Sequence, residues 1–323
     1  MLNYPIKFQP ILQEKIWGGQ KLSHLLGKPS ESEALGESWE ISGVKGNISE
    51  VANGALAGKD LRQLLSTFQA ELVGRQVLRS FGQEFPLLIK FIDAKSDLSV
   101  QLHPDDRIAQ ERHESFGKTE MWYVMQADPG ARLNIGFNRS VDKTEYLSHL
   151  ESGKIIDLLN FVEVDKGDAF FIAPGKVHAI GGGVLIAEIQ QTSDITYRIY
   201  DWDRTDDSGK PRELHTELAL EVIDFEKKED YRRPYKKIRN TPSNIASCQY
   251  FTTNFLPVTG IVERNLSKLD SFVIYMCVEG TASIEIFGNK ETIKTGETLL
   301  IPASAPEAVI LAEDASLLEV YIS

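Results

Sequence analysis

Residues 167–178 read Gly167-Asp-Ala-Phe-Phe-Ile-Ala-Pro-Gly-Lys-Val-His178, and the same pattern returns without gaps as Gly296-Glu-Thr-Leu-Leu-Ile-Pro-Ala-Ser-Ala-Pro-Glu307. Both copies run from a glycine and an acid through an apolar strand to a proline-containing turn. Glycine permits the tight turn before the strand and proline redirects the chain after it, so the twelfth residue is expected to point inward. The repeat therefore predicts two related β-barrels, with His178 inside the first and Glu307 inside the second.

Short strands with two-residue periodicity surround both copies, a pattern typical of an antiparallel sandwich or barrel. In the second half, strands are expected at residues 272–278, 281–287, 298–302 and 317–321. In the first half, they are expected at residues 86–93, 98–103, 119–126, 168–173, 184–191 and 196–202. Candidate helices interrupt the first half at residues 60–73, 105–116, 143–159 and 212–225. We predict a mainly β chain with two barrels and helical insertions in the N-terminal half.

A highly charged stretch separates the two halves. Residues 226–240 contain ten charged residues and Pro234 in fifteen positions, a composition that favours an exposed connector. We therefore predict an N-terminal domain of residues 1–235 and a C-terminal domain of residues 236–323. No histidine follows His215, so only the N-terminal domain can hold a metal site that uses histidine.

The composition excludes several classes of function. The 323 residues carry 47 acidic against 35 basic side chains, a net charge of −12, which argues against a nucleic-acid partner. The longest apolar run, residues 272–278, is far shorter than a membrane span. Cys248 and Cys277 are the only cysteines, so neither a disulfide framework nor a CxxC site exists. We expect a cytoplasmic protein without a secretion signal or membrane partner, and the sequence leaves its oligomeric state open.

Four side chains have the spacing of metal ligands. Gln101 and His103 lie two apart on a predicted strand and therefore share a face. Glu120 begins another strand, and His178 follows the proline-containing turn. Two imidazoles, one carboxylate and one amide oxygen leave coordination positions free for water or substrate, which is typical of a catalytic site. The simplest metal is Zn²⁺ acting as a Lewis acid, although such ligands also suit Fe²⁺ or Mn²⁺.

Three cations lie close in sequence to these ligands. Lys90, Lys118 and Arg198 each occupy a predicted strand, where an unpaired buried charge is costly. Each can reach the rim or pair with an acid. Alternatively, all three line the mouth of one barrel and form a positive pocket for a phosphorylated substrate. Glu188, on an otherwise apolar strand, could carry a proton, pair with Arg198 or form a buried salt bridge.

Five stretches together carry a resemblance to a known family. They are Pro86-Leu-Leu-Ile-Lys90, Leu98-Ser-Val-Gln-Leu-His-Pro-Asp105, Gly117-Lys-Thr-Glu-Met-Trp122, Pro174-Gly-Lys-Val-His-Ala179 and Glu188-Ile-Gln-Gln-Thr-Ser-Asp-Ile-Thr-Tyr-Arg198. These stretches resemble the type I mannose-6-phosphate isomerases in their short bacterial form. The resemblance extends from Trp17-Gly-Gly and Glu37-Ser-Trp-Glu40 to the C-terminal barrel. One departure is Ala173-Pro174-Gly175, where the family has Pro-x-Gly before the histidine.

The resemblance implies a fold, a reaction and roles for the residues already selected. The family consists of metal-dependent cupins, which implies two cupin-type jelly-roll barrels with a degenerate second one. It implies one zinc ion per chain, bound by Gln101, His103, Glu120 and His178, and a small-molecule sugar phosphate as substrate. The reaction interconverts mannose 6-phosphate and fructose 6-phosphate by moving a proton between C2 and C1 through a cis-enediol. We expect Arg198 and Lys118 to be catalytic and Lys90 and Glu188 to bind substrate; the carbon base stays open among Glu188, Lys118 and Lys90.

Two alternative functions use the same residues. Two histidines and a carboxylate also suit an iron-dependent dioxygenase or oxidase, but the basic residues around the site argue against it. A sugar-phosphate-binding module with an idle metal would leave Arg198 and Lys118, beside an intact ligand set, without a role. The sequence therefore favours the isomerase.

Overall fold

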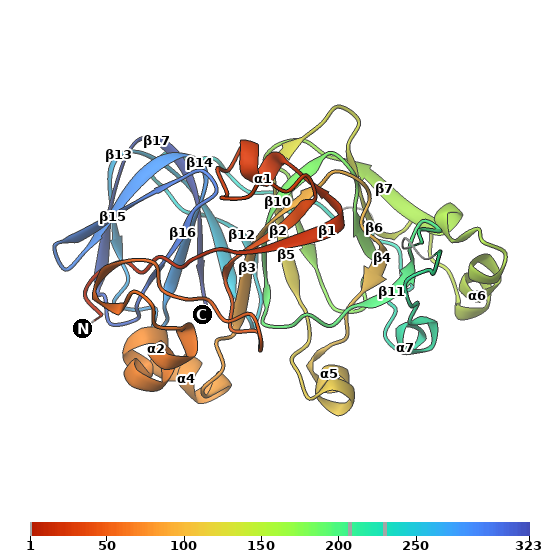
Figure 1. Ribbon diagram of the computed structural model, residues 1–323, viewed down its shortest axis with the longest axis horizontal. Coiled ribbons are helices and arrows are strands. Elements are labelled where there is room, and N and C mark those ends of the chain that lie inside the picture. The colour runs from red at the N-terminus through yellow and green to blue at the C-terminus, as the bar shows by residue number, and fades with distance from the viewer. Residues whose placement is uncertain (1, 206–208, 229–230) are drawn as a thin grey trace.

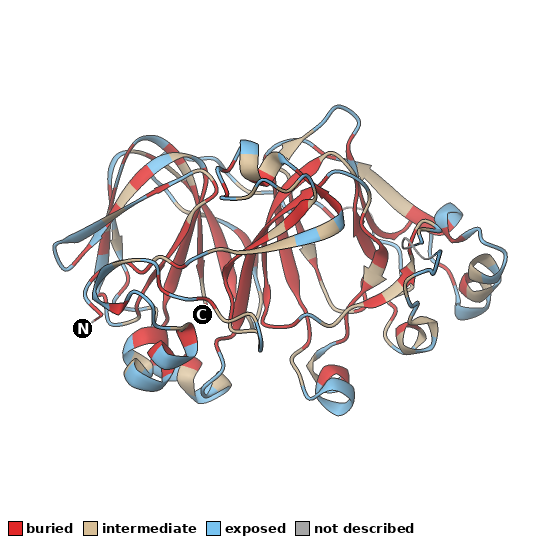
Figure 2. Cartoon of the chain, viewed as in Figure 1, coloured by how far each residue is buried: buried red, intermediate tan, exposed pale blue. Residues whose placement is uncertain are grey.

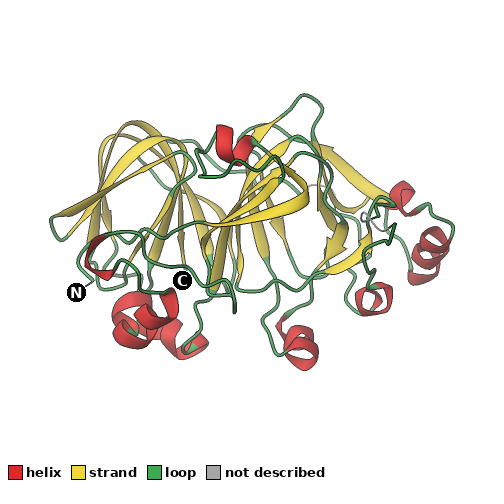
Figure 3. Cartoon of the chain, in the orientation of Figure 1, coloured by secondary structure: helices red, strands yellow, loops and turns green. Residues whose placement is uncertain are grey.

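The strands of the computed structural model form three antiparallel sheets (Figures 1 and 3). The structure describes residues 2–205, 209–228 and 231–323. The first sheet has the order β1 (Ile11–Gly19), β2 (Leu35–Ile41), β3 (Leu87–Ala94), β10 (Val184–Gln191), β5 (Glu120–Ala127) and β8 (Ala169–Ile172). The second has the order β11 (Tyr197–Tyr200), β4 (Val100–Leu102), β9 (His178–Ile180), β6 (Arg132–Phe137) and β7 (Leu159–Glu163). The third has the order β12 (Ser243–Ser247), β13 (Thr252–Asn265), β17 (Glu307–Tyr321), β14 (Val273–Ile286) and β15 (Asn289–Lys294), with β16 (Thr298–Ile301) paired to β14.

The helices of the described residues all lie in the N-terminal half, where they were expected. They are α1 (Lys21–His24), α2 (Leu61–Phe68), α3 (Ala70–Val73), α4 (Arg75–Phe81), α5 (Asp106–His113), α6 (Lys143–Glu151) and α7 (Thr216–Leu220), with 3₁₀ turns at Gly54–Leu56 and Ile155–Leu158. In the described part of the chain, every helix precedes residue 221. The helix expected at 60–73 divides at Gln69, whose φ is +44°. The helix expected at 212–225 shortens to α7. No helix among the described residues is long and apolar enough to cross a membrane.

The mainly β prediction is confirmed, and the structure refines its details. The strands expected at 272–278 and 281–287 are one strand, β14, because Gly280 adopts a φ of +78° and the pairing with β17 shifts register there without ending. None of the three described sheets closes on itself. Glu307, expected to point inward, is exposed at the start of β17. The turn before it binds α3 instead, where the Ala303 amide donates to the Leu72 carbonyl, and Ala308 faces the core.

The first two sheets face each other, and the first sheet is also covered on its other side (Figure 2). Between the two sheets, Ile92 and Trp122 pack with Leu133 and Ile180. Polar side chains, described below, occupy one end of this interior. The strands β3 and β10 are buried at every position, so each has one face toward this interior and one toward a second core.

That second core joins the two halves of the chain. The outer face of the first sheet contributes Ile89 and Phe91, and the third sheet contributes Ile274 and Leu318. The N-terminal segment, α2 and α3 also belong to it. Ile6 forms a β-bridge with Leu300 of β16. Residues far apart in sequence therefore share one hydrophobic core. The first sheet, called the central sheet below, lies between the site and the C-terminal half.

Candidate metal centre

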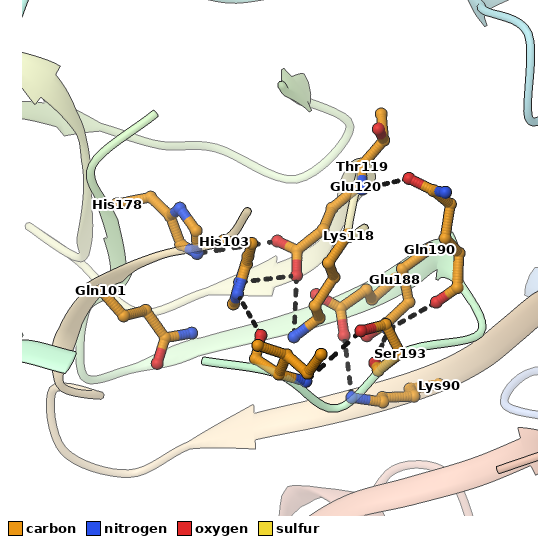
Figure 4. A network of polar contacts seen from close by, with 12 residues as sticks. Lys90, Gln101, His103, Lys118, Thr119, Glu120, His178, Glu188, Gln190 and Ser193 are labelled. Atoms are coloured by element: carbon orange, nitrogen blue, oxygen red, sulfur yellow. Dashed lines mark hydrogen bonds and ion pairs between the residues drawn. The ribbon is translucent and has the colours of Figure 1, made fainter. Parts of the chain in front are cut away.

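The four predicted ligands lie where the two facing sheets meet (Figure 4). Gln101 is in β4, His103 follows it, and His178 begins β9, so the five-stranded sheet supplies three of them. Glu120 begins β5 in the opposite sheet. Gln101 and His178 are direct partners across the β4–β9 ladder. The structure therefore brings together residues that are up to 77 positions apart in the sequence.

His103, Glu120 and His178 form a tight buried cluster. Their potential ligand atoms all lie within 4.8 Å of one another. The Nε2 of His103 is 3.2 Å from Oε1 of Glu120, and the Nε2 of His178 is 3.8 Å from Oε2. All three side chains are almost completely excluded from solvent.

Backbone carbonyls orient both imidazoles. The Nδ1 of His103 donates to the Ile195 carbonyl at 2.7 Å, and the Nδ1 of His178 donates to the Lys176 carbonyl at 2.8 Å. This places the proton on Nδ1 and leaves Nε2 as a lone-pair donor. The Nε2 atoms of both histidines and Oε2 of Glu120 are buried without a hydrogen-bond partner. Buried polar atoms without partners are costly unless something binds them, and these three fit a divalent metal ion.

The electrostatics of the cluster favour the forms that bind a metal. Burial, together with the nearby Lys118, lowers the pKa of His103 to about 3. Burial likewise lowers the pKa of His178. Burial alone would raise the pKa of Glu120, but the ammonium of Lys118 holds it well below its ordinary value. At neutral pH the cluster is thus two neutral imidazoles and one carboxylate, a donor set that suits Zn²⁺ and related cations.

A cavity of about 180 Å³ opens beside the cluster and is rich in cations. Lys90, Lys118 and Arg198, the three predicted cations, all line it, and so does Gln101. The Nζ of Lys118 is 3.1 Å from Oε1 of Glu120, which links the cavity wall to the cluster. Such a wall gives an acidic protein one local site for an anionic ligand.

Arg198 presents an unsatisfied donor in this wall. Its Nη1 donates to the Glu213 carbonyl at 2.9 Å, while its Nε is buried without a partner. Burial and the neighbouring Arg212 lower the pKa of the guanidinium. A guanidinium with a free donor is suited to bind a phosphate or a developing oxyanion.

Glu188 lies behind the wall instead of on it. Its Oε1 accepts a hydrogen bond from Trp122 Nε1 at 2.8 Å, and its Oε2 is 3.4 Å from the Nζ of Lys90. The pairing with Arg198 considered from the sequence is therefore replaced by a pairing with Lys90. Burial and the charge of Glu120 raise the pKa of Glu188.

The cavity wall also includes residues to which sequence reasoning assigned no role. These are Lys15, Trp17, Glu37, Trp39, Asp194 and Arg212, among others. Glu37 accepts a hydrogen bond from Trp39 Nε1 at 2.6 Å and lies 3.9 Å from Lys90. Burial raises the pKa of Glu37, but Lys90 and Lys15 outweigh it and the net shift is downward. The signal available in the sequence was the two-residue spacing of Glu37 and Trp39, the same spacing that selected Gln101 and His103.

Comparison with known proteins gives consistent matches over almost the whole chain. The family described as phosphomannose isomerase type I, catalytic domain, matches residues 6–127, and the mannose-6-phosphate isomerase cupin domain matches residues 242–321. The mannose-6-phosphate isomerase of Streptococcus mutans is 34% identical over 299 residues, 92% of each chain. Mannose-6-phosphate isomerase ManA of Bacillus subtilis is 34% identical over 305 residues, 94% of each chain.

Solved structures agree with these sequence matches. The crystal structure of the mannose 6-phosphate isomerase from Bacillus subtilis superimposes with a TM-score of 0.89 at 33% identity, covering 99% of this chain and all of that one. The apo form of the Salmonella typhimurium enzyme gives a TM-score of 0.79 at 18% identity, covering 99% of each chain. The second match shows a shared fold alone.

Proposed function

This chain belongs to the type I mannose-6-phosphate isomerases, and from that premise we propose that it is a zinc enzyme that interconverts mannose 6-phosphate and fructose 6-phosphate through a cis-enediol. The observation that carries the proposal is the juxtaposition of two features. One is the cluster of buried, unpartnered ligand atoms of His103, Glu120 and His178. The other is the cation-lined cavity that adjoins it, whose size and charge suit a small sugar phosphate.

We propose one zinc ion per chain, held by Gln101, His103, Glu120 and His178. The two histidines and the glutamate supply the converging donors described above, and Gln101 supplies an amide oxygen from the same cavity wall. A bound zinc ion supplies Lewis-acid polarisation of substrate oxygens. Since three protein groups and one weak donor leave coordination positions free, substrate or water has access.

The reaction needs a proton to move from C2 of the aldose to C1 of the ketose. A base removes the C2 proton, the hydroxyl proton on O2 moves to O1, and the first proton returns to C1. We propose Arg198 and Lys118 as the catalytic residues. Arg198 has a free donor to stabilise the negative charge that develops on the enediol oxygens. Lys118 lies in the cavity wall within 3.1 Å of Glu120, where it can exchange protons with substrate.

We propose that Lys90 and Glu188 bind the substrate as a pair. Burial lowers the pKa of Lys90, but Glu37 and Glu188 outweigh it and the net shift is upward, so the ammonium stays charged. A permanently charged Lys90 is suited to bind an anionic oxygen and unsuited to act as a base. Glu188, behind the wall, holds that ammonium in place. Two candidates for the base then remain, Lys118 and Glu188, and of these Lys118 lines the cavity.

We extend the proposal to architecture and location. We propose two cupin-type jelly-roll barrels with helical insertions in the first, a catalytic domain of residues 1–235 and a degenerate domain of residues 236–323. The cupin-domain match over residues 242–321 supports the second barrel. We expect the enzyme to be cytoplasmic, with a small-molecule substrate and neither nucleic acid nor membrane as partner.

A three-state assay tests the proposal. Turnover of mannose 6-phosphate to fructose 6-phosphate is measured on the enzyme as purified, after chelation and after zinc is restored, with zinc content measured in each state. We expect activity to disappear with chelation and to return at about one zinc per chain. Absence of turnover in the zinc-loaded enzyme would refute the isomerase, and full activity after complete metal removal would refute the zinc requirement.

A further inference from the structure

One hydrogen bond from the C-terminal half reaches the segment between two proposed metal ligands. Tyr250, in the turn between β12 and β13, donates its hydroxyl to Oδ2 of Asp106. Asp106 begins α5, which lies along the lower edge of the first half in Figure 1. Because α5 sits between His103 and Glu120 in the sequence, anything that fixes Asp106 restrains the chain between these two residues.

The other carboxylate oxygen of Asp106 holds residues 117–119, the segment that leads into β5. Oδ1 accepts hydrogen bonds from the Gly117 amide at 2.8 Å and from Nε2 of Gln191 at 2.9 Å. The Gln191 side chain in turn accepts from the Thr119 amide at 2.9 Å. Lys118 lies between these two anchored amides and Glu120 follows them. The backbone of the proposed catalytic lysine is thus held on both sides by groups that depend on Asp106.

The close approach at Gly117 shows that this contact is tightly built. A Cβ at this position would lie 2.6 Å from the Asp105 carbonyl carbon and 2.6 Å from the Asp106 amide nitrogen. Only glycine brings the two segments this near. Asp106 is half-buried, and it shares with Tyr250 the wall of a cavity of about 280 Å³ between the two halves. Burial and the Asp106 carboxylate raise the pKa of Tyr250 to about 12, so its hydroxyl keeps its proton and acts as the donor at neutral pH.

We propose that Tyr250 is a positioning residue of the active site: through Asp106, the C-terminal half fixes residues 117–119 and thereby the placement of Lys118 and Glu120. The positioning itself stands on the hydrogen bonds above, while its catalytic consequence rests on the proposed isomerase function. This gives the C-terminal half, which supplies none of the proposed ligands, a direct part in the site.

Replacing Tyr250 by phenylalanine removes only the hydroxyl. We expect amide hydrogen exchange at residues 117–119 of Tyr250→Phe to accelerate roughly tenfold, because the acceptor of the Gly117 amide loses its anchor. We expect kcat to fall severalfold, less than the roughly tenfold or more that is lost when a direct hydrogen-bond partner of a metal ligand is removed, because Tyr250 acts through Asp106. Tyr275→Phe is the matched control, because its hydroxyl also donates to a carboxylate, that of Glu319, but within the C-terminal half. That variant is expected to leave exchange at residues 117–119 and kcat unchanged.

A double-mutant cycle separates positioning from a general loss of stability. Asp106→Ala removes the shared acceptor, so adding Tyr250→Phe to it should change kcat and local exchange no further. Asp106→Asn, which keeps one acceptor oxygen, should retain most of the protection at residues 117–119. Unchanged exchange and kcat in Tyr250→Phe, or effects that add in full in the double variant, would overturn the proposal. A wild-type enzyme without isomerase activity would refute the proposed function alone, since the exchange measurement tests the hydrogen-bonded link by itself.

Discussion

Both proposed histidine ligands are oriented by the backbone, independently of any metal. The Ile195 and Lys176 carbonyls fix the Nδ1 protons, so the Nε2 lone pairs of His103 and His178 converge on Glu120. Preorganisation of this kind lowers the cost of binding because the rings need not be ordered at that moment. The removal of one histidine therefore takes away a donor that no neighbouring side chain replaces.

His103→Ala is expected to abolish zinc binding at stoichiometric concentrations and to lower kcat/KM at least a hundredfold. Zinc content after gel filtration and initial rates with mannose 6-phosphate measure both effects. His149→Ala serves as the control, because His149 lies on α6 and its Nδ1 donates only to the Glu145 carbonyl one turn away. If His103→Ala kept a full zinc equivalent, the proposed ligand set would be wrong.

Lys90→Met is expected to raise KM for mannose 6-phosphate roughly tenfold or more, with a smaller change in kcat. The reason is that Lys90 stays charged between Glu37 and Glu188 and presents that charge to the cavity. Steady-state kinetics separates the two parameters. Lys15→Met offers a comparison, because Lys15 lines the same cavity with a more exposed side chain and should change KM less. An equal effect of the two substitutions would argue against a special role for Lys90.

The sequence predicted the residues of this site unequally. Gln101 and His103 were selected because an alternating strand places residues two apart on one face, Glu120 because it begins a strand, and His178 because it follows the proline-containing turn. Glu37 was left without a role because the strand that carries it, β2, was not predicted. Its run Leu35–Ile41 mixes glycine, acids and apolar residues, so the two-residue spacing of Glu37 and Trp39, both of which line the cavity, was the one signal that the sequence offered.

The segment after β11 organises the cationic side of the site through two contacts. Asp201 accepts hydrogen bonds from both Arg204 and Arg212, and it is nearly excluded from solvent. Farther along, His215 meets Arg198 in β11. The hydrogen bonds of Asp201 lie within this irregular segment, whereas the His215 contact ties the segment to β11. Each contact can be removed by a single substitution.

Asp201→Asn is expected to destabilise the fold by about 2 kcal/mol at neutral pH, since charged hydrogen bonds are lost from a buried site. Burial alone would raise the pKa of Asp201, but the two arginines outweigh it and hold it below its ordinary value of 3.8. A carboxylate with a lowered folded-state pKa stabilises fully above its unfolded value and ceases to do so as the pH falls through the folded value. Urea unfolding at several pH values should therefore show the difference between wild type and Asp201→Asn disappearing only below about pH 4. A constant difference down to pH 2 would contradict this assignment.

His215→Ala is expected to lower kcat severalfold, because the Nδ1 of His215 accepts the Arg198 backbone amide at 3.1 Å and no other acceptor replaces it. The His215 amide donates back to the Arg198 carbonyl at 2.7 Å, which keeps the two segments together in the variant. His215→Asn can offer Oδ1 in place of Nδ1 and should recover most of the lost activity. Rates for the three proteins at saturating substrate decide the matter, and equal losses in both variants would exclude the amide contact as the cause.

Among the strands, the sequence predicts those that are short and bounded by turns well, and those that are long poorly. The range of β10, Val184–Gln191, was predicted to the residue. The long strand β13 was missed because Pro257 and Gly260 lie inside it, and both residues usually end strands. The structure accommodates them by a register shift between Val258 and Gly260 against β17.

The whole molecule is held together by the core that both halves share. That core includes Leu2 and Ile6 from the N-terminal segment, Phe91 from the central sheet, and Phe272 and Leu318 from the C-terminal half. The predicted boundary between residues 235 and 236 lies within the charged connector, yet the connector itself pairs with the first half, where the Arg233 amide donates to the Ala169 carbonyl. Charge composition marks a connector; it carries no information on which surfaces pack against each other.

A truncated protein of residues 1–240 is expected to be insoluble or inactive, because removal of the C-terminal half exposes to water the apolar residues, among them Ile89 and Phe91, that belong to the shared core. Expression, gel filtration and isomerase assays on this fragment test the expectation. The full-length enzyme with a protease site inserted at Gly288, in the exposed turn between β14 and β15, is a suitable control for the cost of interrupting the chain. A monomeric, active fragment would show that the shared core is dispensable.

Alternate residues of β3 face two different parts of the molecule. Lys90 faces the cavity, while its neighbours Ile89 and Phe91 face the C-terminal half. Alternate residues of one strand thus serve the active site and the packing of the two halves. A lineage that exchanged its C-terminal half for an unrelated one would have to alter Ile89 and Phe91 without disturbing the lysine between them. The two halves are therefore expected to be inherited together, and recombination at the connector should be rare among descendants that keep the activity.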